Sequence, residues 1–187
     1  MRLPPVGRTL ITTFGLGFMR PAPGTWGSLP PCVFAALFPL LRGTDLIGPV
    51  GGVFWYVVQV FFAVYFSWIC LKFGDKAEAE FGKKDPSEVV ADETAGMGVT
   101  LLFLPHWWLR IPGATVQQSN DRTLIATLGA IALAFVLFRI ADIIKAPPAR
   151  GLQRLKGGAG ILVDDLIAGV QAGLVLMGLC WVWHAYF

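Results

Sequence analysis

The chain alternates between long apolar stretches and polar segments. Five apolar stretches stand out, at residues 29–41, 50–71, 94–109, 123–144 and 166–187. The second, fourth and fifth have about 22 residues each, and a helix of that length crosses a hydrocarbon core about 30 Å thick. The first and third are shorter, so we expect them to tilt, to re-enter the membrane or to pack against the others. The pattern predicts an all-α integral membrane protein, a helical bundle of about three to five hydrophobic helices.

The polar segments between these stretches differ in charge. If all five stretches cross the membrane, residues 1–28, 72–93 and 145–165 lie on one side. Lys and Arg residues are concentrated there, and cytoplasmic segments of membrane proteins are enriched in both. On that side are Arg2, Arg8, Arg20, Lys72, Lys76, Lys83, Lys84, Lys145, Arg150, Arg154 and Lys156, and on the other are Arg42, Arg110 and Arg122. We therefore expect the three polar segments, and any site that they form, to face the cytoplasm.

Composition narrows the class of protein further. The chain is 55% hydrophobic and 14% charged, whereas soluble domains are about 45–50% apolar and about 25% charged. This excludes a disordered chain, a nucleic-acid-binding domain and an ordinary soluble enzyme, and a net charge of +3 is too small to indicate a polyanionic partner. The widely spaced Cys32, Cys70 and Cys180 exclude a disulfide scaffold and a thiolate zinc site. The length predicts a single membrane-embedded domain over residues 1–187.

A glycine- and proline-rich segment, residues 14–28, precedes the first apolar stretch. Its composition predicts a shaped loop rather than a helix, with Ser28 as the N-cap of the helix that follows. Free backbone amides at a helix start can hold a phosphate, and Arg20, Thr25 and Ser28 are close in sequence. The alternative is a capped turn that only leads into a membrane helix.

Acidic pairs stand at the start of two apolar stretches. Asp92 and Glu93 precede the third stretch, and Asp164 and Asp165 precede the fifth. Each pair either caps its helix and complements the helix dipole, or supplies oxygen ligands to Mg²⁺, a hard cation. Adjacent helical residues point about 100° apart, so one residue of the second pair can cap while the other binds metal.

Two further segments carry groups that suit a phosphate. Arg139, Asp142 and Lys145 are spaced by three near the end of the fourth stretch, so they share one face of a helix. Charged residues in a membrane helix usually face a polar interior, although an internal Arg–Asp pair with a snorkelling Lys is the alternative. The glycine turn at Gly157 and Gly158 can cradle a phosphate through its backbone amides.

Together these segments predict phosphoryl chemistry on a lipid headgroup. Carboxylates can hold a divalent cation and basic groups can hold phosphate oxygens, which stabilises charge at a phosphoryl centre. Cys followed by five residues and Arg, and Asp-x-Asp-x-Thr, are both missing from the sequence, and His106 and His184 fall on or near the expected non-cytoplasmic side. Direct attack by water therefore fits best. The alternatives are an enzyme like the CDP-alcohol phosphotransferases, or a small membrane transporter or scaffold.

The residues also carry a resemblance to a known family. Residues 15–17 with 23–28, 92–97, 138–145 and 157–165 are similar to motifs of the phosphatidylglycerophosphatase A family, in the same order. The resemblance covers residues 14–169 and departs from the family at 145–148, which reads Lys-Ala-Pro-Pro where Lys-Pro-x-Pro is usual. It implies a Mg²⁺-dependent enzyme of the bacterial inner membrane that converts phosphatidylglycerophosphate to phosphatidylglycerol in phospholipid biosynthesis.

Roles for individual residues are predicted from their chemistry. The expected metal ligands are Asp92, Glu93, Asp164 and Asp165, with Asp142 next. One carboxylate outside the metal shell can orient or deprotonate the attacking water. The expected phosphate-binding residues are Arg20, Thr25, Ser28, Arg139, Lys145, Arg150, Gly157 and Gly158. The expected partners are the phospholipid substrate and the membrane, with no nucleic acid.

Overall fold

The structure is a computed structural model that describes residues 3–41, 51–105, 116–144 and 157–186. These residues form helices and contain no strand, which confirms the all-α prediction. The elements are α1 (Pro5–Ile11), the 3-10 helix η1 (Leu16–Phe18), α2 (Pro23–Gly27), α3 (Leu29–Leu41), α4 (Gly51–Phe81), α5 (Ala91–Leu102), α6 (Val116–Ile144) and α8 (Gly158–Tyr186).

Three of these helices are long and apolar enough to cross a membrane. The candidate spans are Val53–Phe81 in α4, Leu124–Ile144 in α6 and Gly158–Tyr186 in α8. By contrast, α3 has 13 residues and α5 has 12, so each is about 20 Å long or less at 1.5 Å per residue and falls short of a hydrocarbon core of about 30 Å. Within the described residues, the two short apolar stretches are thus short helices packed on three long ones.

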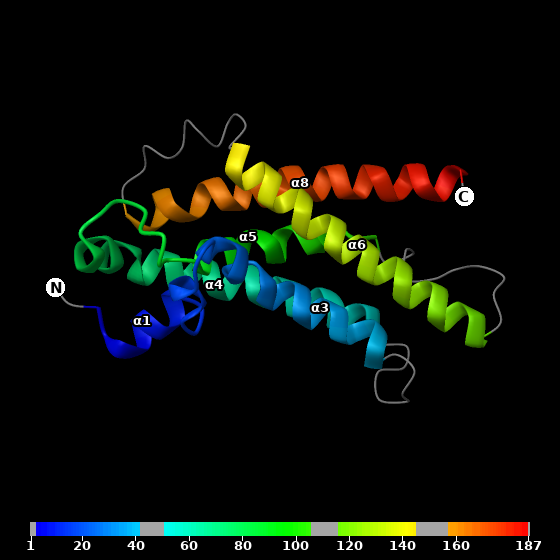
Figure 1. The fold of residues 1–187 in the computed structure, drawn as a ribbon, viewed down its shortest axis with the longest axis horizontal. Helices are drawn as coiled ribbons and strands as arrows, with labels where there is room; N and C mark the ends of the chain where they lie inside the picture. Colours follow the sequence, from blue (N-terminus) through cyan, green and yellow to red (C-terminus); the bar gives the residue numbers. More distant parts are fainter. Residues whose placement is uncertain (1–2, 42–50, 106–115, 145–156, 187) are drawn as a thin grey trace.

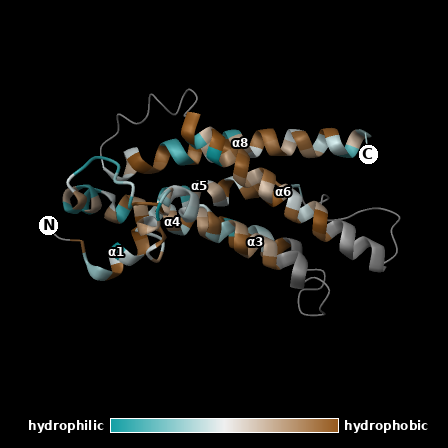
Figure 2. Ribbon diagram, viewed as in Figure 1, coloured by the Kyte–Doolittle hydropathy of each residue, from teal (hydrophilic) through white to brown (hydrophobic). Residues whose placement is uncertain are grey.

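The helices alternate in direction. In Figure 1, α3, α5 and α8 run away from the end of the bundle where the N-terminus lies, whereas α4 and α6 run back toward it. The starts of α5 and α8 therefore meet the ends of α4 and α6 at this one end, which we call the polar end. Figure 2 shows hydrophilic residues gathered there around the end of α4 and the segment that leads into α5. The alternation places residues 3–28 and 72–93 at the same end of the bundle, as the sequence predicts for these charged segments.

Helix α5 lies at the centre of the bundle, between α4 and α8. Small residues let its neighbours approach closely: a Cβ on Gly98 would be 3.0 Å from the backbone N of Ala63 in α4, and a Cβ on Gly169 in α8 would meet the carbonyl oxygen of Gly96. Nine of the 12 residues of α5 are buried. The helix therefore holds its first turn in a fixed position relative to both neighbours.

Helices α4, α6 and α8 extend further than the apolar pattern indicates, and α6 begins at Val116 rather than at residue 123. Helix α4 continues through the polar residues 72–81, a segment rich in Lys, Ala and Glu, which are strong helix formers. Helix α8 begins at Gly158 rather than after the acidic pair, and the Gly158 N–H donates a 3.0 Å hydrogen bond to Asp75 Oδ1 on α4. The polar segments are thus partly helical, and the start of α8 is tied to α4.

The N-terminal residues 3–28 pack over the polar end of the bundle. The Leu3 N–H donates to Glu80 on α4 over 2.9 Å. The expected loop at residues 14–28 is instead built from η1 and α2. Ser28 stands directly before α3, as expected for its N-cap, and it is also the C-cap of α2, with its hydroxyl donating to the Gly24 carbonyl over 2.8 Å. This segment reaches the first turn of α5, where the acidic residues stand.

Candidate metal centre and phosphate site

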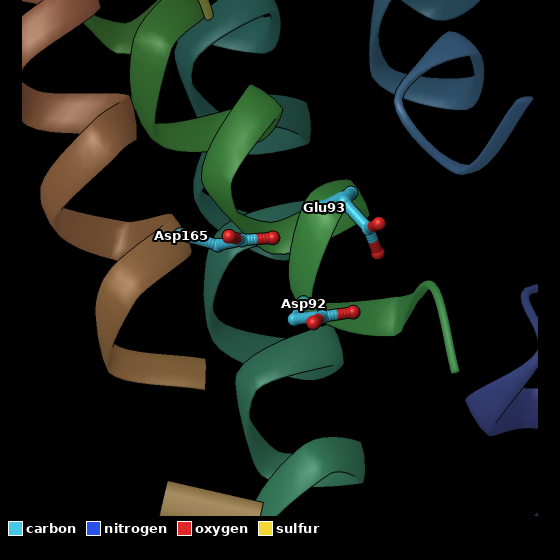
Figure 3. Close-up of side chains that lie close together, drawn as sticks. All are labelled: Asp92, Glu93 and Asp165. Carbon is cyan, nitrogen blue, oxygen red and sulfur yellow. The ribbon is translucent and has the colours of Figure 1, made fainter. Parts of the chain in front are cut away.

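Three carboxylates from two helices meet at the polar end. Asp92 and Glu93 come from the first turn of α5 and Asp165 from α8, and one oxygen of each lies within 4.8 Å of the others. Figure 3 shows Asp165 reaching from α8 toward the turn that carries Asp92 and Glu93. The exposed fractions of Asp92 and Asp165 are only 5% and 3%. We call Asp92, Glu93 and Asp165 the carboxylate cluster.

The cluster does not cap either helix. The N-cap of α5 is Val90, without a side-chain capping hydrogen bond, and Asp92 and Glu93 lie inside the first turn. Asp164 and Asp165 are the seventh and eighth residues of α8, about two turns from its start. Neither pair therefore acts as an N-cap, although Asp92 and Glu93, in the first turn of α5, do complement the helix dipole as the alternative expected.

Because the cluster is buried, ionising all three of its carboxylates costs free energy. It raises the pKa of Asp92 well above the usual range, and the negative charges of Glu93 and Asp165 add to that effect. Burial also raises the pKa of Glu93 to about 7. A cation between the carboxylates would offset their repulsion and restore the charged forms.

The oxygens of the cluster are suited to such a cation. Asp92 Oδ1 and Glu93 Oε2 are buried and have no hydrogen-bond partner among the described residues. A buried polar atom without a partner is rare in proteins and calls for an explanation such as an ion. An all-oxygen donor set is the type that a hard divalent cation prefers. The residues present therefore fit the expected metal.

An ion pair adjoins the cluster. On α6, Arg139 Nη1 lies 2.8 Å from Asp142 Oδ2. The Asp142 carboxylate interacts with both Glu93 and Asp165, and the Arg139 charge acts on Glu93. This is the internal Arg–Asp pair that the sequence left open as the alternative, and the structure also brings its helix face to the carboxylates.

Not every expected ligand joins the cluster. Asp164 is buried, with 3% exposed, but is not part of the group whose oxygens converge. Its neighbour Asp165 takes that place because successive helical side chains point about 100° apart. The sequence left open which residue of the pair binds metal, and the structure favours Asp165.

The expected phosphate-binding residues are spread more widely. Thr25 is half-buried in α2 and Arg20 is exposed. The Ser28 hydroxyl donates a hydrogen bond to the Gly24 carbonyl, and the Gly158 amide donates one to Asp75. Gly157 also packs against Asp75. The expected phosphate ligands Lys145 and Arg150 lie outside the described residues.

His184 lies in the last turn of α8, at the far end of that helix from the cluster. His106 lies outside the described residues.

Sequence reasoning missed Gly24 as a neighbour of the cluster. A Cβ on this residue would overlap Glu93 Oε1 and would be 3.0 Å from Arg139 Nη1. Gly24 is one of several glycines in residues 14–28, and local sequence does not reveal which of them faces the site.

Comparisons with known proteins point to one family. A family model described as Phosphatidylglycerophosphatase A matches residues 9–180. Proteins named Phosphatidylglycerophosphatase A from Haemophilus influenzae and Escherichia coli are 29% and 30% identical to the chain, covering 91% and 89% of it and 86% and 79% of their own lengths. A Bacteroides thetaiotaomicron protein, provisionally named a phosphatidylinositol-3-phosphatase, is 34% identical over 91% of both chains. No solved structure gives a significant match.

Proposed function

This chain belongs to the phosphatidylglycerophosphatase A family, and we propose that it hydrolyses the terminal phosphate monoester of phosphatidylglycerophosphate, giving phosphatidylglycerol and phosphate for phospholipid biosynthesis. The observation that carries the proposal is the carboxylate cluster, a buried all-oxygen group at the polar end of an apolar bundle. We further propose that the enzyme lies in the bacterial inner membrane, as one domain, with this cluster on the cytoplasmic side.

The apolar surface of α4 supports a position of the site near the membrane–water interface. Exposed apolar side chains run over residues 53–71, a length of about 27 Å that is close to the hydrocarbon thickness of about 30 Å. Lys72 follows directly, with its Nζ 4.3 Å from the centroid of the Trp68 ring. A cation beside an aromatic ring at the end of an apolar surface is typical of the membrane–water interface.

The cluster lies close to that interface. Cys70, between Trp68 and Lys72, belongs to the same buried apolar cluster as Ala91, which directly precedes Asp92. On α6, Asp142 is followed by the exposed Ile143 and Ile144. A lipid whose acyl chains remain in the bilayer would thus bring its headgroup phosphate to the carboxylates.

The proposed mechanism assigns roles to residues of this chain. Asp92, Glu93 and Asp165 would hold Mg²⁺, which when bound supplies positive charge to the phosphoryl oxygens. Arg139 lies beside Glu93 and would bind a phosphate oxygen as a charged donor. Asp142 lies beside Asp165 and is placed to orient or deprotonate the attacking water.

Other groups complete the proposed phosphate site. Arg20, Lys145 and Arg150 would add positive charge, and Thr25 and the backbone of Gly157 would add further donors. The Ser28 hydroxyl and the Gly158 amide would have to exchange their partners Gly24 and Asp75 for the phosphate. Asp164 is also proposed as a metal ligand or general base, as the second choice after Asp165.

The proposal is tested with protein purified in detergent. We expect phosphate release from phosphatidylglycerophosphate that requires Mg²⁺ and stops with a chelator. Asp92→Asn, Glu93→Gln and Asp165→Asn should each lower turnover by at least about 100-fold, since changes to residues that only support metal ligands already cost about 10–100-fold. The matched control Glu80→Gln lies outside both the cluster and the proposed phosphate site and keeps an oxygen that accepts from the Leu3 N–H, so it should retain near-normal turnover.

The same assay separates the alternatives. Phosphatidylinositol 3-phosphate serves as a second substrate because of the name that the Bacteroides thetaiotaomicron relative carries, and faster release from it would change the proposed substrate. A transporter, a scaffold or an enzyme like the CDP-alcohol phosphotransferases would release phosphate from neither lipid. Near-normal turnover in all three cluster variants would contradict the metal site.

A further inference from the structure

A buried threonine joins three segments directly beside the carboxylate cluster. Thr94 follows Glu93 in α5 and has no exposed surface. Its Oγ1 lies 2.7 Å from the carbonyl oxygen of Gly27, 2.9 Å from that of Val90 and 3.0 Å from the hydroxyl of Thr13. These partners come from the end of α2, the N-cap of α5 and the turn after α1.

The donor arrangement at this junction follows from the number of protons. A hydroxyl has one proton to donate and can accept at its lone pairs. The Gly27 and Val90 carbonyls only accept, so the Thr94 hydroxyl donates to them, and the shorter distance favours Gly27. The Thr13 hydroxyl then donates to Thr94, which gives a chain from Thr13 through Thr94 to Gly27.

The backbone at Thr13 shows that this position is held in place. Thr13 has a φ of 45°, and the next residue, Phe14, has a φ of 59°. A β-branched residue with positive φ is a rare outlier, which persists only where the surrounding contacts enforce it. The buried hydrogen bond to Thr94 is such a contact.

The junction holds α2 against the site. Gly27 ends α2, and Gly24, one turn earlier in the same short helix, packs directly on Glu93 and Arg139. The Ser28 hydroxyl bonds the Gly24 carbonyl and keeps this turn closed. A shift of α2 would therefore open space beside the Glu93 carboxylate.

We propose that Thr94 is a positioning residue: its hydroxyl, with that of Thr13, fixes α2 on the first turn of α5 and so holds the Glu93 carboxylate in its place in the cluster. The role in turnover rests on the proposed phosphatase function. The position of α2 does not, and it can be measured separately.

The test compares substitutions that differ only in the hydroxyl. Thr94→Val keeps the shape of the side chain and removes the donor, whereas Thr94→Ser keeps the donor and removes a methyl group. Thr127→Val is the matched control, because Thr127 in α6 is also fully buried and its hydroxyl has no hydrogen-bond partner among the described residues. The readouts are kcat and KM, and amide hydrogen exchange of residues 22–28 by mass spectrometry in the detergent-purified protein.

We expect Thr94→Val to lower kcat by about tenfold with little change in KM, since the Gly27 carbonyl loses its buried donor and Glu93 loses its support. Exchange in residues 22–28 should become faster in that variant. Thr94→Ser and Thr127→Val should match the wild type in both readouts. If Thr94→Val does not accumulate, Thr13→Val removes the hydroxyl that donates to Thr94 and leaves the bond from Thr94 to Gly27 in place, so a smaller change in the same direction is expected in both readouts.

The outcomes separate this inference from the proposed function. If the wild type releases no phosphate, the proposed function fails, and hydrogen exchange still decides whether the hydroxyl holds α2. If the wild type is active but Thr94→Val keeps normal kcat and normal exchange, the positioning role is wrong. Equal impairment of Thr94→Ser and Thr94→Val would also overturn it, because the methyl group rather than the hydroxyl would then matter.

Discussion

At the scale of single residues, Glu93 is where most contacts of the site converge. It belongs to the carboxylate cluster, it feels the charges of Arg139 and Asp142, and Gly24 packs against it. Its orientation is therefore set by three segments that are distant in sequence. If Glu93 binds a metal as proposed, these contacts would preorganise it as a ligand.

Gly24→Ala tests this packing. The residue is helical, so the backbone accepts Ala, but the added Cβ would overlap Glu93 Oε1. We expect kcat to fall by about 10–100-fold, as when a ligand's supporting contacts are lost. Gly129→Ala in α6 is the control, since nothing lies within 4 Å of its Cβ position. Steady-state kinetics and thermal unfolding of both variants provide the measurement, and normal kcat in Gly24→Ala would show that α2 does not restrain Glu93.

The sequence could identify acidic residues but not their grouping. The sequence shows that carboxylates stand beside apolar stretches, at Asp92, Glu93 and Asp165. A charged residue in such a place is energetically costly and usually has a functional role. The choice of Asp165 over Asp164 depends on the rotation of α8, which is set by its contacts with α4, α5 and α6. The junction of Thr13, Thr94 and Gly27 is a product of folding, since its members are up to 81 residues apart.

At the scale of elements, the site depends on how closely α8 approaches α5. Gly169 of α8 faces the Gly96 carbonyl, and the Thr100 hydroxyl lies 3.1 Å and 3.2 Å from the carbonyl oxygens of Gly96 and Gly169. Small residues and shared hydroxyls of this kind are typical of close helix packing in membranes. This contact lies one turn beyond Asp165, so the spacing of the two helices sets the width of the cluster.

Gly169→Ala is expected to weaken metal binding rather than the chemical step. Its Cβ would collide with the Gly96 carbonyl, which belongs to the backbone and cannot rotate away, so α8 must shift and carry Asp165 from Asp92. We expect the half-saturating Mg²⁺ concentration to rise by about tenfold, in line with the loss of support for a ligand. Thermal stabilisation by Mg²⁺ should weaken in parallel.

The control for this prediction lies on the same helix. Gly178→Ala adds a Cβ with nothing within 4 Å, so it changes helix composition without changing helix spacing. It should keep the wild-type Mg²⁺ dependence. An unchanged Mg²⁺ dependence in Gly169→Ala itself would mean that the α5–α8 distance does not control the cluster.

Hydropathy predicted the helices better than their ends. The stretch 29–41 coincides with α3, because its apolar run and its helix end together. Helices α4 and α8 run into polar sequence, where helix propensity and the bond between Gly158 and Asp75 extend them. The position of the second acidic pair inside α8 followed from that extension, and a hydropathy profile contains no signal for it.

At the scale of the whole molecule, the two ends of the bundle differ in chemistry. The polar end holds the carboxylates, the ion pair and the N-terminal segment. The far end of α8 exposes Trp181, Trp183 and Tyr186, and exposed Trp and Tyr are enriched at membrane–water interfaces. With Trp68 and Lys72 near the polar end, aromatic residues mark both ends of the apolar surface, as expected for a bundle that crosses the bilayer.

The direction in which the bundle crosses can be tested with two cysteines. Ala79 lies near the end of α4 at the polar end, and Ala185 lies in the last turn of α8 at the opposite end. Both are exposed, and replacing Ala by Cys changes little. Because Lys and Arg cluster in the segments at the polar end, we expect that end in the cytoplasm. In intact cells, an impermeant thiol reagent should therefore label Ala185→Cys and not Ala79→Cys.

The background for this experiment is favourable, because the native Cys32, Cys70 and Cys180 are all buried and can be replaced by Ala beforehand. Permeabilising the cells should make Ala79→Cys reactive, which controls for a cysteine that is merely shielded. Phosphatase activity of both variants checks that the bundle is intact. Labelling of Ala79→Cys from outside intact cells, with Ala185→Cys protected, would reverse the orientation and place the carboxylate cluster on the outer side of the membrane.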